Sequence, residues 1–165
     1  MANSNPPPIP DDEFSDPLEN YDAPVYADPL EEALATRTVT DLAAQPCETI
    51  SADTSIAEAV KKLVSIHHAC LLVEDEGRLA GLFTDRDLLD RVVLEFEDCR
   101  DQPLRTVMTP DPVYVSESDC PAAVLAVMAV SGFRHVPVLD ADGMIAGIVS
   151  PRRITEFLLE HSPSE

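Results

Sequence analysis

The chain has 165 residues, a length that suits one compact domain or two small ones and needs no disulfide or metal to stabilise its core. Its 31 acidic and 11 basic residues give a formal net charge of −20, which argues against free nucleic acid or an anionic membrane as a partner of the whole surface. No secretory signal is recognisable, and the longest apolar run, residues 122–130, is too short to span a bilayer, so we expect a cytoplasmic protein. Cys47 and Cys70 lie in apolar runs and are predicted to be buried free thiols, and no cysteine has zinc-like spacing.

Residues 1–36 differ in composition from the rest of the chain. They hold seven of the 15 prolines, many acidic residues and no lysine or arginine. Such a segment has little to bury and repels itself, so we expect a mostly disordered tail with a short helical turn at residues 30–35. The alternative to a solvated tail is a segment that docks on a partner or on the protein's own cleft. It would do so with its acidic residues and the aromatic side chains of Phe14, Tyr21 and Tyr26.

Two domains are predicted after the tail, at residues 37–99 and 100–162. In the first, a turn precedes a strand, an amphipathic helix, two strands joined by a tight turn, and a second helix. The ranges expected for these five elements are 47–51, 54–65, 69–74, 78–83 and 84–96. The order is β-α-β-β-α.

The second domain repeats that order at an offset of 66 residues. Gly143 and Gly147 follow Gly77 and Gly81 by this distance, and a coincidence at residues that set backbone geometry indicates duplication. The expected elements are residues 113–116, 120–131, 135–140, 144–149 and 151–160. The fold class is therefore predicted to be α/β, with two tandem repeats related by a pseudo-twofold axis.

One helix of the second repeat is unusual because residues 122–130 carry no charge on any face. A helix that is apolar all round must be covered on more than one side. We expect it to lie in an interface, either between the two domains or between two chains.

The pattern h-x-x-h-M-T-x-x-P-h-x-V, in which h is an apolar residue, occupies residues 104–115. The pattern G-h-h-T/S ends the last strand of each repeat, at residues 81–84 and 147–150. These patterns resemble a tandem pair of cystathionine-beta-synthase (CBS) domains, also called a Bateman module, over about residues 38–162. The resemblance implies a disc-like pseudo-twofold pair that is often dimerised again. It also implies an adenosine-containing ligand in the cleft, such as AMP, ADP, ATP or S-adenosylmethionine.

Thr84 and Asp87 are the leading site candidates. A hydroxyl at a helix start and a carboxylate three positions later form a capping box, which is a purely structural role. The same residues offer a hydroxyl and backbone N–H groups to a phosphate and a carboxylate to both hydroxyls of a ribose, so the two roles are compatible. By the resemblance, Thr84 would contact phosphate or ribose and Asp87 the ribose diol, and Arg86 between them would reach a phosphate or point into water.

The second repeat departs from this pattern. Ser150 keeps the hydroxyl, but Arg153 replaces the acid and cannot accept hydrogen bonds from a diol. The second cleft is therefore expected to bind no nucleotide in the usual pose, or to hold phosphates with Arg152 and Arg153.

Further basic residues precede a strand of each repeat. Arg134 and His135 align with His68 and Ala69, at a place where relatives often present basic side chains to phosphates. Pairing with surface acids is the alternative. The resemblance also places the strands around Ile50 and Val113 against the base.

The leading functional hypothesis is a stand-alone regulatory module that binds an adenosine-containing ligand and signals to an unidentified protein partner by a conformational change. The alternative is a dimerising scaffold that binds no nucleotide. An enzyme is not expected, because the sequence contains no recognisable nucleophile and base pattern and no metal-ligand set. A homodimer is expected under either hypothesis.

Overall fold

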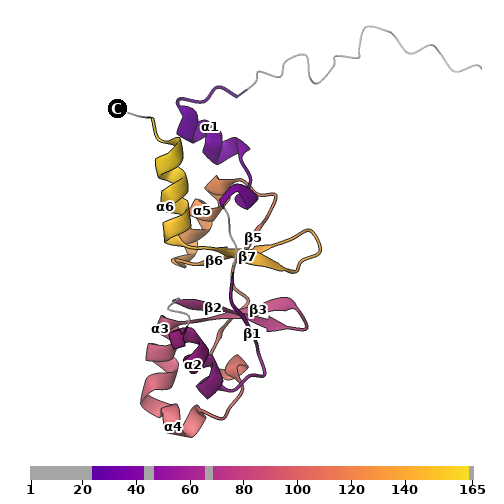
Figure 1. Cartoon of the computed structure of the whole chain (residues 1–165), viewed down its shortest axis with the longest axis vertical. Helices are drawn as coiled ribbons and strands as arrows, with labels where there is room; N and C mark the ends of the chain where they lie inside the picture. The colour runs from indigo at the N-terminus through magenta and orange to yellow at the C-terminus, as the bar shows by residue number, and fades with distance from the viewer. Residues whose placement is uncertain (1–23, 43–46, 66–68, 164–165) are drawn as a thin grey trace, which may run out of the picture.

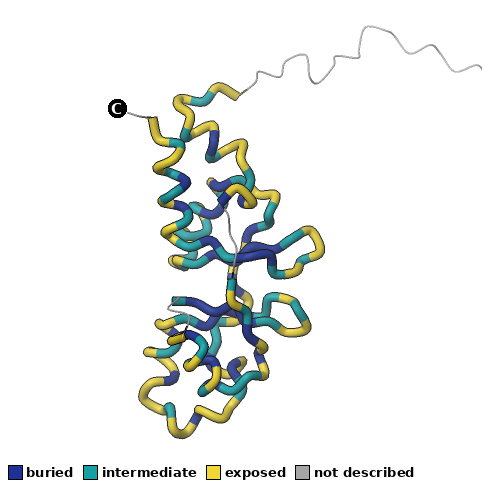
Figure 2. The backbone as a smooth tube through the Cα atoms, viewed as in Figure 1, coloured by how far each residue is buried: buried dark blue, intermediate teal, exposed yellow. Residues whose placement is uncertain are grey.

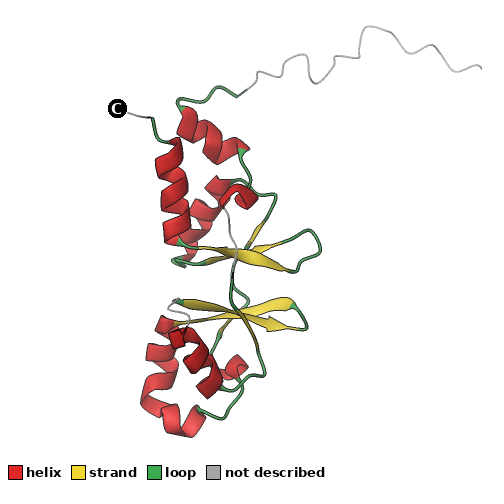
Figure 3. Ribbon diagram, viewed as in Figure 1, coloured by secondary structure: helices red, strands yellow, loops and turns green. Residues whose placement is uncertain are grey.

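The computed structural model describes residues 24–42, 47–65 and 69–163, which form two lobes of similar design (Figure 1). Lobe 1 has a four-stranded sheet in the order β1-β2-β3-β4, and lobe 2 has a three-stranded sheet in the order β5-β6-β7. The two sheets face each other at the centre of the molecule and the helices lie on their outer faces (Figure 3). The predicted α/β pair of repeats is confirmed.

Lobe 1 contains the strands of the first repeat and one strand of the linker between the repeats. Strand β1 runs parallel to β2, β2 pairs antiparallel with β3, and β3 pairs antiparallel with β4. Helix α2 buries Ile56, Ala59 and Leu63, whose spacing places them on one helical face. The bounds are β1 (Thr49–Ser51), α2 (Ile56–Ser65), β2 (Cys70–Asp75), β3 (Arg78–Thr84) and β4 (Thr109–Pro110).

The helix predicted over residues 84–96 is not continuous. It consists of α3 (Asp85–Asp87), the π-helical segment η2 (Leu88–Val92), the 3₁₀ segment η3 (Val93–Glu95) and α4 (Phe96–Cys99). Val92 is fully buried in the lobe 1 core, whereas Leu94 is 94% exposed. Tertiary packing of Val92 therefore overrides the regular helical spacing, and the prediction of one regular helix was wrong.

Lobe 2 has the second copy of the same arrangement. Strand β5 is parallel to β6, and β6 pairs antiparallel with β7. Gly132 ends α5 in a left-handed conformation with φ of 68°. The bounds are η4 (Leu104–Thr106) in the linker, then β5 (Val115–Ser116), α5 (Pro121–Ser131), β6 (Val136–Leu139), β7 (Ile145–Val149) and α6 (Pro151–His161).

The segment before each repeat completes the core of the other lobe. Helix α1 (Pro29–Thr36) and the 3₁₀ turn η1 (Val39–Leu42) contact α5 and α6 of lobe 2, where Ala33, Val39 and Leu42 are buried. In the same way, residues 99–107 contribute Cys99, Leu104 and Val107 to the core of lobe 1. The chain therefore crosses between the lobes twice, which ties them together (Figure 1).

Helix α1 lies within the segment whose composition predicted a tail. The helical turn expected at residues 30–35 is confirmed, and the helix belongs to lobe 2 because Ala33 is buried there. Asp28 caps this helix by accepting a hydrogen bond from the Glu31 backbone N–H at 2.8 Å, and Pro29 occupies the first helical turn. The rest of the predicted tail, residues 1–23, lies outside the described residues.

Apolar side chains join the lobes between the two sheets. Cys70, Leu72 and Leu82 are buried there, and Ile145 and Ile148 of lobe 2 pack against them. Figure 2 shows these buried strands in dark blue on both sides of the central plane. This contact positions the end of β3 opposite the start of β6.

The uncharged helix α5 is only partly covered. Val124 is buried against lobe 2, but Val130 is 89% exposed and Ala122, Ala126 and Ala129 are also exposed. The expectation that α5 lies between the two lobes was therefore wrong, because its covered face packs on α1, η1 and β6. Its burial between two chains stays a prediction. Among the described residues, no helix combines the length and the apolar character required to cross a membrane.

Candidate functional site

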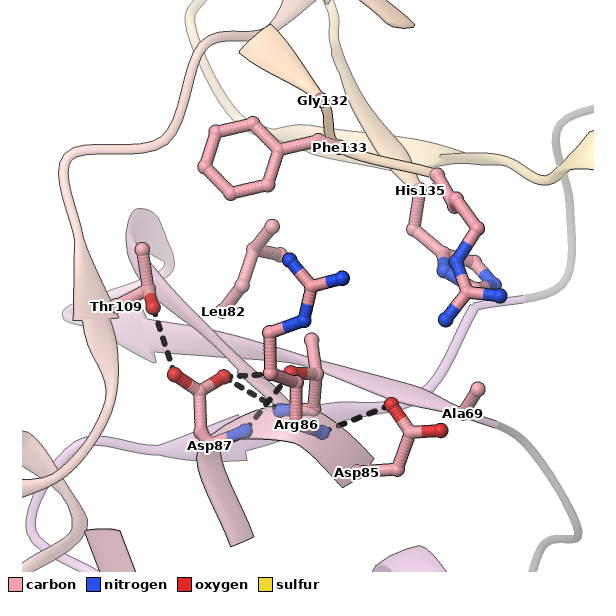
Figure 4. Close-up of a pocket in the computed structure, with 11 residues that line it drawn as sticks. Ala69, Leu82, Asp85, Arg86, Asp87, Thr109, Gly132, Phe133 and His135 are labelled. Carbon is pink, nitrogen blue, oxygen red and sulfur yellow. Dashed lines mark hydrogen bonds between the residues drawn. The ribbon is translucent and has the colours of Figure 1, made fainter. Parts of the chain in front are cut away.

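A pocket lies between the lobes, where β3 ends and the segment from α5 to β6 faces it (Figure 4). It encloses about 550 Å³, including space that is open to solvent. Its lining consists of Ala69, Leu82, Thr84, Asp85, Arg86, Asp87, Thr109, Gly132, Phe133, Arg134 and His135.

Thr84 and Asp87 form the predicted capping box at the start of α3. The Thr84 hydroxyl oxygen accepts a hydrogen bond from the Asp87 backbone N–H at 3.2 Å. In return, Asp87 Oδ2 accepts bonds from the Thr84 backbone N–H at 2.9 Å and from the Thr84 hydroxyl at 2.7 Å. The extended Thr84 backbone, with φ of −120°, turns directly into the helix and keeps both side chains at the pocket.

The Asp87 carboxylate has partners beyond its own helix. Its Oδ1 accepts a hydrogen bond from the Thr109 hydroxyl at 2.8 Å and lies 3.3 Å from Arg91 Nη1. Asp87 is 5% exposed and is the only buried charged residue in the described part of the chain. The ion pair with Arg91 offsets the cost of burying this charge. The pocket therefore has a preorganised anionic hydrogen-bond acceptor at its base.

Basic side chains line another part of the pocket. Arg86 extends from α3 toward lobe 2, and His135 lies on lobe 2 (Figure 4). Arg134, next to His135, also lines the pocket. Neither Arg86 nor Arg134 forms an ion pair within the part of the chain that the structure describes, although acidic residues outnumber basic ones almost threefold. Both guanidinium groups thus remain available to an anionic group in the pocket.

Apolar side chains supply the remaining walls. Leu82 and Ala69 belong to lobe 1, and Phe133 projects from lobe 2 on the opposite side (Figure 4). A flat apolar or aromatic group would fit between these walls. Sequence reasoning missed Phe133 and Thr109, although Thr109 is the threonine of the M-T pattern and Phe133 directly precedes Arg134.

The structure brings Thr84, Arg86, Asp87, Arg134 and His135 together at one pocket, although they come from different repeats. That they bind a nucleotide stays a prediction. His68 lies outside the described residues, so its predicted role is not tested.

The other predicted site residues do not line this pocket. The Ile50 side chain is buried in the lobe 1 core, and Val113 is 49% exposed. Ser150 precedes α6 but its side chain makes no capping hydrogen bond. Arg152 Nε donates to Glu156 Oε1 at 2.8 Å, which raises the pKa of Arg152 and lowers that of Glu156, and Arg153 is half-buried. The predicted contact of Ile50 and Val113 with the adenine base is not tested. The predicted roles of Ser150, Arg152 and Arg153 in a second cleft also stay predictions. No group of three or more candidate metal ligands occurs in the described ranges.

The thiol of Cys70 lies in the apolar layer beside the pocket. Burial, together with the nearby negative charges of Asp87 and Asp85, raises the pKa of Cys70 to about 12. We therefore expect Cys70 to remain protonated at pH 8 and to react with iodoacetamide about a thousandfold more slowly than an ordinary thiol. Peptide mass spectrometry of a labelling time course would measure this rate, with the partly exposed Cys120 as the internal control. Equal rates for the two cysteines would contradict the expected burial of Cys70.

The chain belongs to the CBS domain family, because the CBS domain model matches residues 39–94 and 104–160, more than half of the sequence. Both repeats are matched, so the protein carries a tandem pair of CBS domains.

Known proteins with this arrangement include several that bind adenosine compounds. The chain is 33% identical, over 111 residues, to the CBS domain-containing protein CBSCBSPB1 of Arabidopsis thaliana, and the match covers 67% of the chain but only 20% of that relative. The structure of CBSX2 in complex with AMP is 27% identical, with a TM-score of 0.64 over 74% of this chain and 96% of that one. The CBS domain pair of MJ0100 in complex with 5′-methylthioadenosine and S-adenosylmethionine is also 27% identical, with a TM-score of 0.63 over 72% and 97% of the two chains.

Proposed function

We propose that this protein is a regulatory module that binds an adenosine-containing ligand in the pocket between its lobes and transmits the binding event to a partner protein. The observation that carries the proposal is the convergence on one pocket of a buried carboxylate, an aromatic wall and two guanidinium groups that form no ion pair among the described residues. The structurally similar CBSX2 and MJ0100 pairs, whose complexes contain AMP and S-adenosylmethionine, support this ligand class.

Each part of an adenine nucleotide has a chemical complement in the pocket. Asp87 would accept hydrogen bonds from the two ribose hydroxyls, because a carboxylate accepts bonds at both oxygens. Arg86 and Arg134 would neutralise the phosphate groups. The base would pack between Phe133 and the apolar side chain of Leu82.

The two arginines favour a phosphorylated ligand over S-adenosylmethionine. The sulfonium of S-adenosylmethionine is cationic and would be repelled by Arg86 and Arg134, whereas the phosphates of AMP, ADP or ATP would be attracted. In a chain with a net charge of −20, these cations also provide a local site that a small anion can approach.

Removing one of the two guanidinium groups should weaken the binding of ligands that carry phosphate. We expect Arg86→Ala and Arg134→Ala each to raise the dissociation constant for ATP about tenfold or more, because a hydrogen bond to a charged group contributes about 1.5–3 kcal/mol. Adenosine, which has no phosphate, should bind the variants and the parent equally. Isothermal titration calorimetry would measure both, with the exposed, ion-paired Arg100→Ala as the control. An equal loss of adenosine and ATP affinity would contradict the assignment of these arginines to phosphate.

The proposal itself is tested by the melting temperature of the purified protein with AMP, ADP, ATP, S-adenosylmethionine or NADH. A ligand present at about a hundred times its dissociation constant adds about 2.7 kcal/mol to the free energy of unfolding. A shift with an adenine nucleotide supports the ligand-binding module. Protein that is free of bound nucleotide and gives no shift with any of these compounds contradicts it.

A dimerising scaffold is the second candidate, and the exposed apolar residues on the outer helices favour dimerisation. Val64, Leu89 and Leu94 on lobe 1 and Val130 and Leu159 on lobe 2 are each more than 60% exposed. Exposed apolar side chains favour association with another chain where they lie together on one face. Sedimentation equilibrium would determine the mass, and a tight dimer that binds no adenine compound would favour the scaffold.

A further inference from the structure

The linker between the two lobes, which contains β4, is hydrogen-bonded to the Asp87 carboxylate. Thr109, in β4 of the linker, donates its hydroxyl to Asp87 Oδ1 at 2.8 Å. Arg91, one turn after Asp87, donates from Nη1 to the carbonyl oxygens of Val107 at 3.0 Å and Met108 at 2.7 Å. The same Nη1 is 3.3 Å from Asp87 Oδ1. The carboxylate at the base of the pocket and the linker thus share one network of contacts.

This carboxylate has few free positions for a ligand. A carboxylate offers about four acceptor sites, and three are taken by the Thr84 backbone N–H, the Thr84 hydroxyl and the Thr109 hydroxyl. Arg91 crowds Oδ1 in addition. A diol that donates two hydrogen bonds to Asp87 therefore requires at least one existing donor to leave.

Thr109 is the donor that can leave most easily. The Thr84 backbone N–H belongs to the helix start, and the Thr84 hydroxyl oxygen also accepts the Asp87 N–H, which holds it in place. Thr109 lies on a separate short strand, which pairs with β3 at two positions and makes one further backbone hydrogen bond to it, from the Asp111 N–H to the Ala80 carbonyl at 3.3 Å. Both Thr109 and Asp87 line the pocket, so a ligand can reach the bond between them (Figure 4).

We propose that the Thr109 hydroxyl is a linker tether that competes with the ligand diol for Asp87, so that occupation of the pocket weakens the attachment of β4 to lobe 1. After β4 the chain passes directly to β5, the first strand of lobe 2. Release of the tether would change how the linker joins the lobes and would give the module a route for signalling. The inference rests on the proposed function, because it requires a ligand diol at Asp87.

The proposed tether predicts that removal of the Thr109 hydroxyl strengthens ligand binding. Thr109→Val keeps the β-branched shape but removes the competing hydroxyl, so we expect it to bind AMP about two- to tenfold more tightly than the parent. Affinity for 2′,3′-dideoxyadenosine monophosphate, which has no diol, should be the same in both. Thr106→Val is the matched control, since Thr106 lies in the same linker but donates to the Pro103 carbonyl. Isothermal titration calorimetry would give the dissociation constants.

Hydrogen exchange of the backbone amides of residues 107–109 and 111 provides the structural readout. In the parent these amides should exchange faster when AMP is bound, and in Thr109→Val they should exchange fast with or without AMP. Unchanged or weaker AMP binding by Thr109→Val, or slower exchange in the AMP-bound parent, would overturn the tether alone. No binding of AMP or any other adenine compound to the parent would instead overturn the proposed function, and the tether with it.

Discussion

Replacing Asp87 by asparagine is expected to weaken AMP binding about a hundredfold. The amide keeps the size of the side chain, but it loses the negative charge and one of the two acceptor oxygens that a ribose diol requires. Two hydrogen bonds to a charged group contribute about 3 kcal/mol or more, which corresponds to this factor. Isothermal titration calorimetry with AMP would measure the change.

Two comparisons separate a binding role for Asp87 from a structural one. Asp90→Asn, on the exposed side of the following turn, should leave AMP affinity unchanged. The Asp87→Asn variant should also bind the dideoxy analogue of AMP as the parent does, because that ligand makes no use of the carboxylate. If AMP and its dideoxy analogue lose affinity equally, Asp87 supports the pocket through its hydrogen bonds to Thr84 and Thr109 and does not contact the ribose.

Gly81→Ala is expected to destabilise the protein more than Gly132→Ala. A Cβ at this position would lie 2.7 Å from the Met108 sulfur and 2.8 Å from the Thr109 carbonyl oxygen. The carbonyl belongs to the paired strand β4 and cannot move without breaking the β3–β4 contact. Overpacking of this kind costs about 1–3 kcal/mol. For a protein of this length the expected fall in Tm is about 3–10 °C.

Gly132→Ala is the matched control for this change. No atom lies within 4 Å of a Cβ added at Gly132, so only its φ of +68° opposes the substitution, at a cost of about 1 kcal/mol. Thermal unfolding followed by circular dichroism would compare the two variants. A fall in Tm for Gly81→Ala that does not exceed that for Gly132→Ala would contradict the expected overpacking, because it would show that Met108 and Thr109 move aside without a loss of stability.

The two halves of the molecule are unequal despite their common fold. In lobe 1 the helix start carries Asp87, whereas the aligned position in lobe 2 is Arg153. Arg152, beside it, is hydrogen-bonded to Glu156 on its own helix. We therefore expect one diol-binding site per chain, so calorimetric titration with AMP should give a stoichiometry of one.

Much of the architecture was predictable from the sequence because it depends on local patterns. The 66-residue repeat of glycines, the apolar strand runs and the helical spacing of Ile56, Ala59 and Leu63 each report a property of neighbouring residues. The capping box of Thr84 and Asp87 is likewise local, since its members are three residues apart. These features predicted the order of elements in both repeats and the position of the site helix.

Contacts between distant segments were decided only by the tertiary structure. Packing of α1 on lobe 2 depends on Ala33 meeting a surface formed by residues about 90 or more positions later, which composition could not indicate. The π-helical turn after Asp87 depends on burial of Val92 in a core that the whole lobe forms. Thr109 reaches Asp87 across 22 residues, and Phe133 enters the same pocket from the other lobe. The sequence by itself therefore determined which elements form and where the site helix begins, whereas packing of the lobes decided which side chains surround the carboxylate, because those contacts join residues with no periodic relation in the chain.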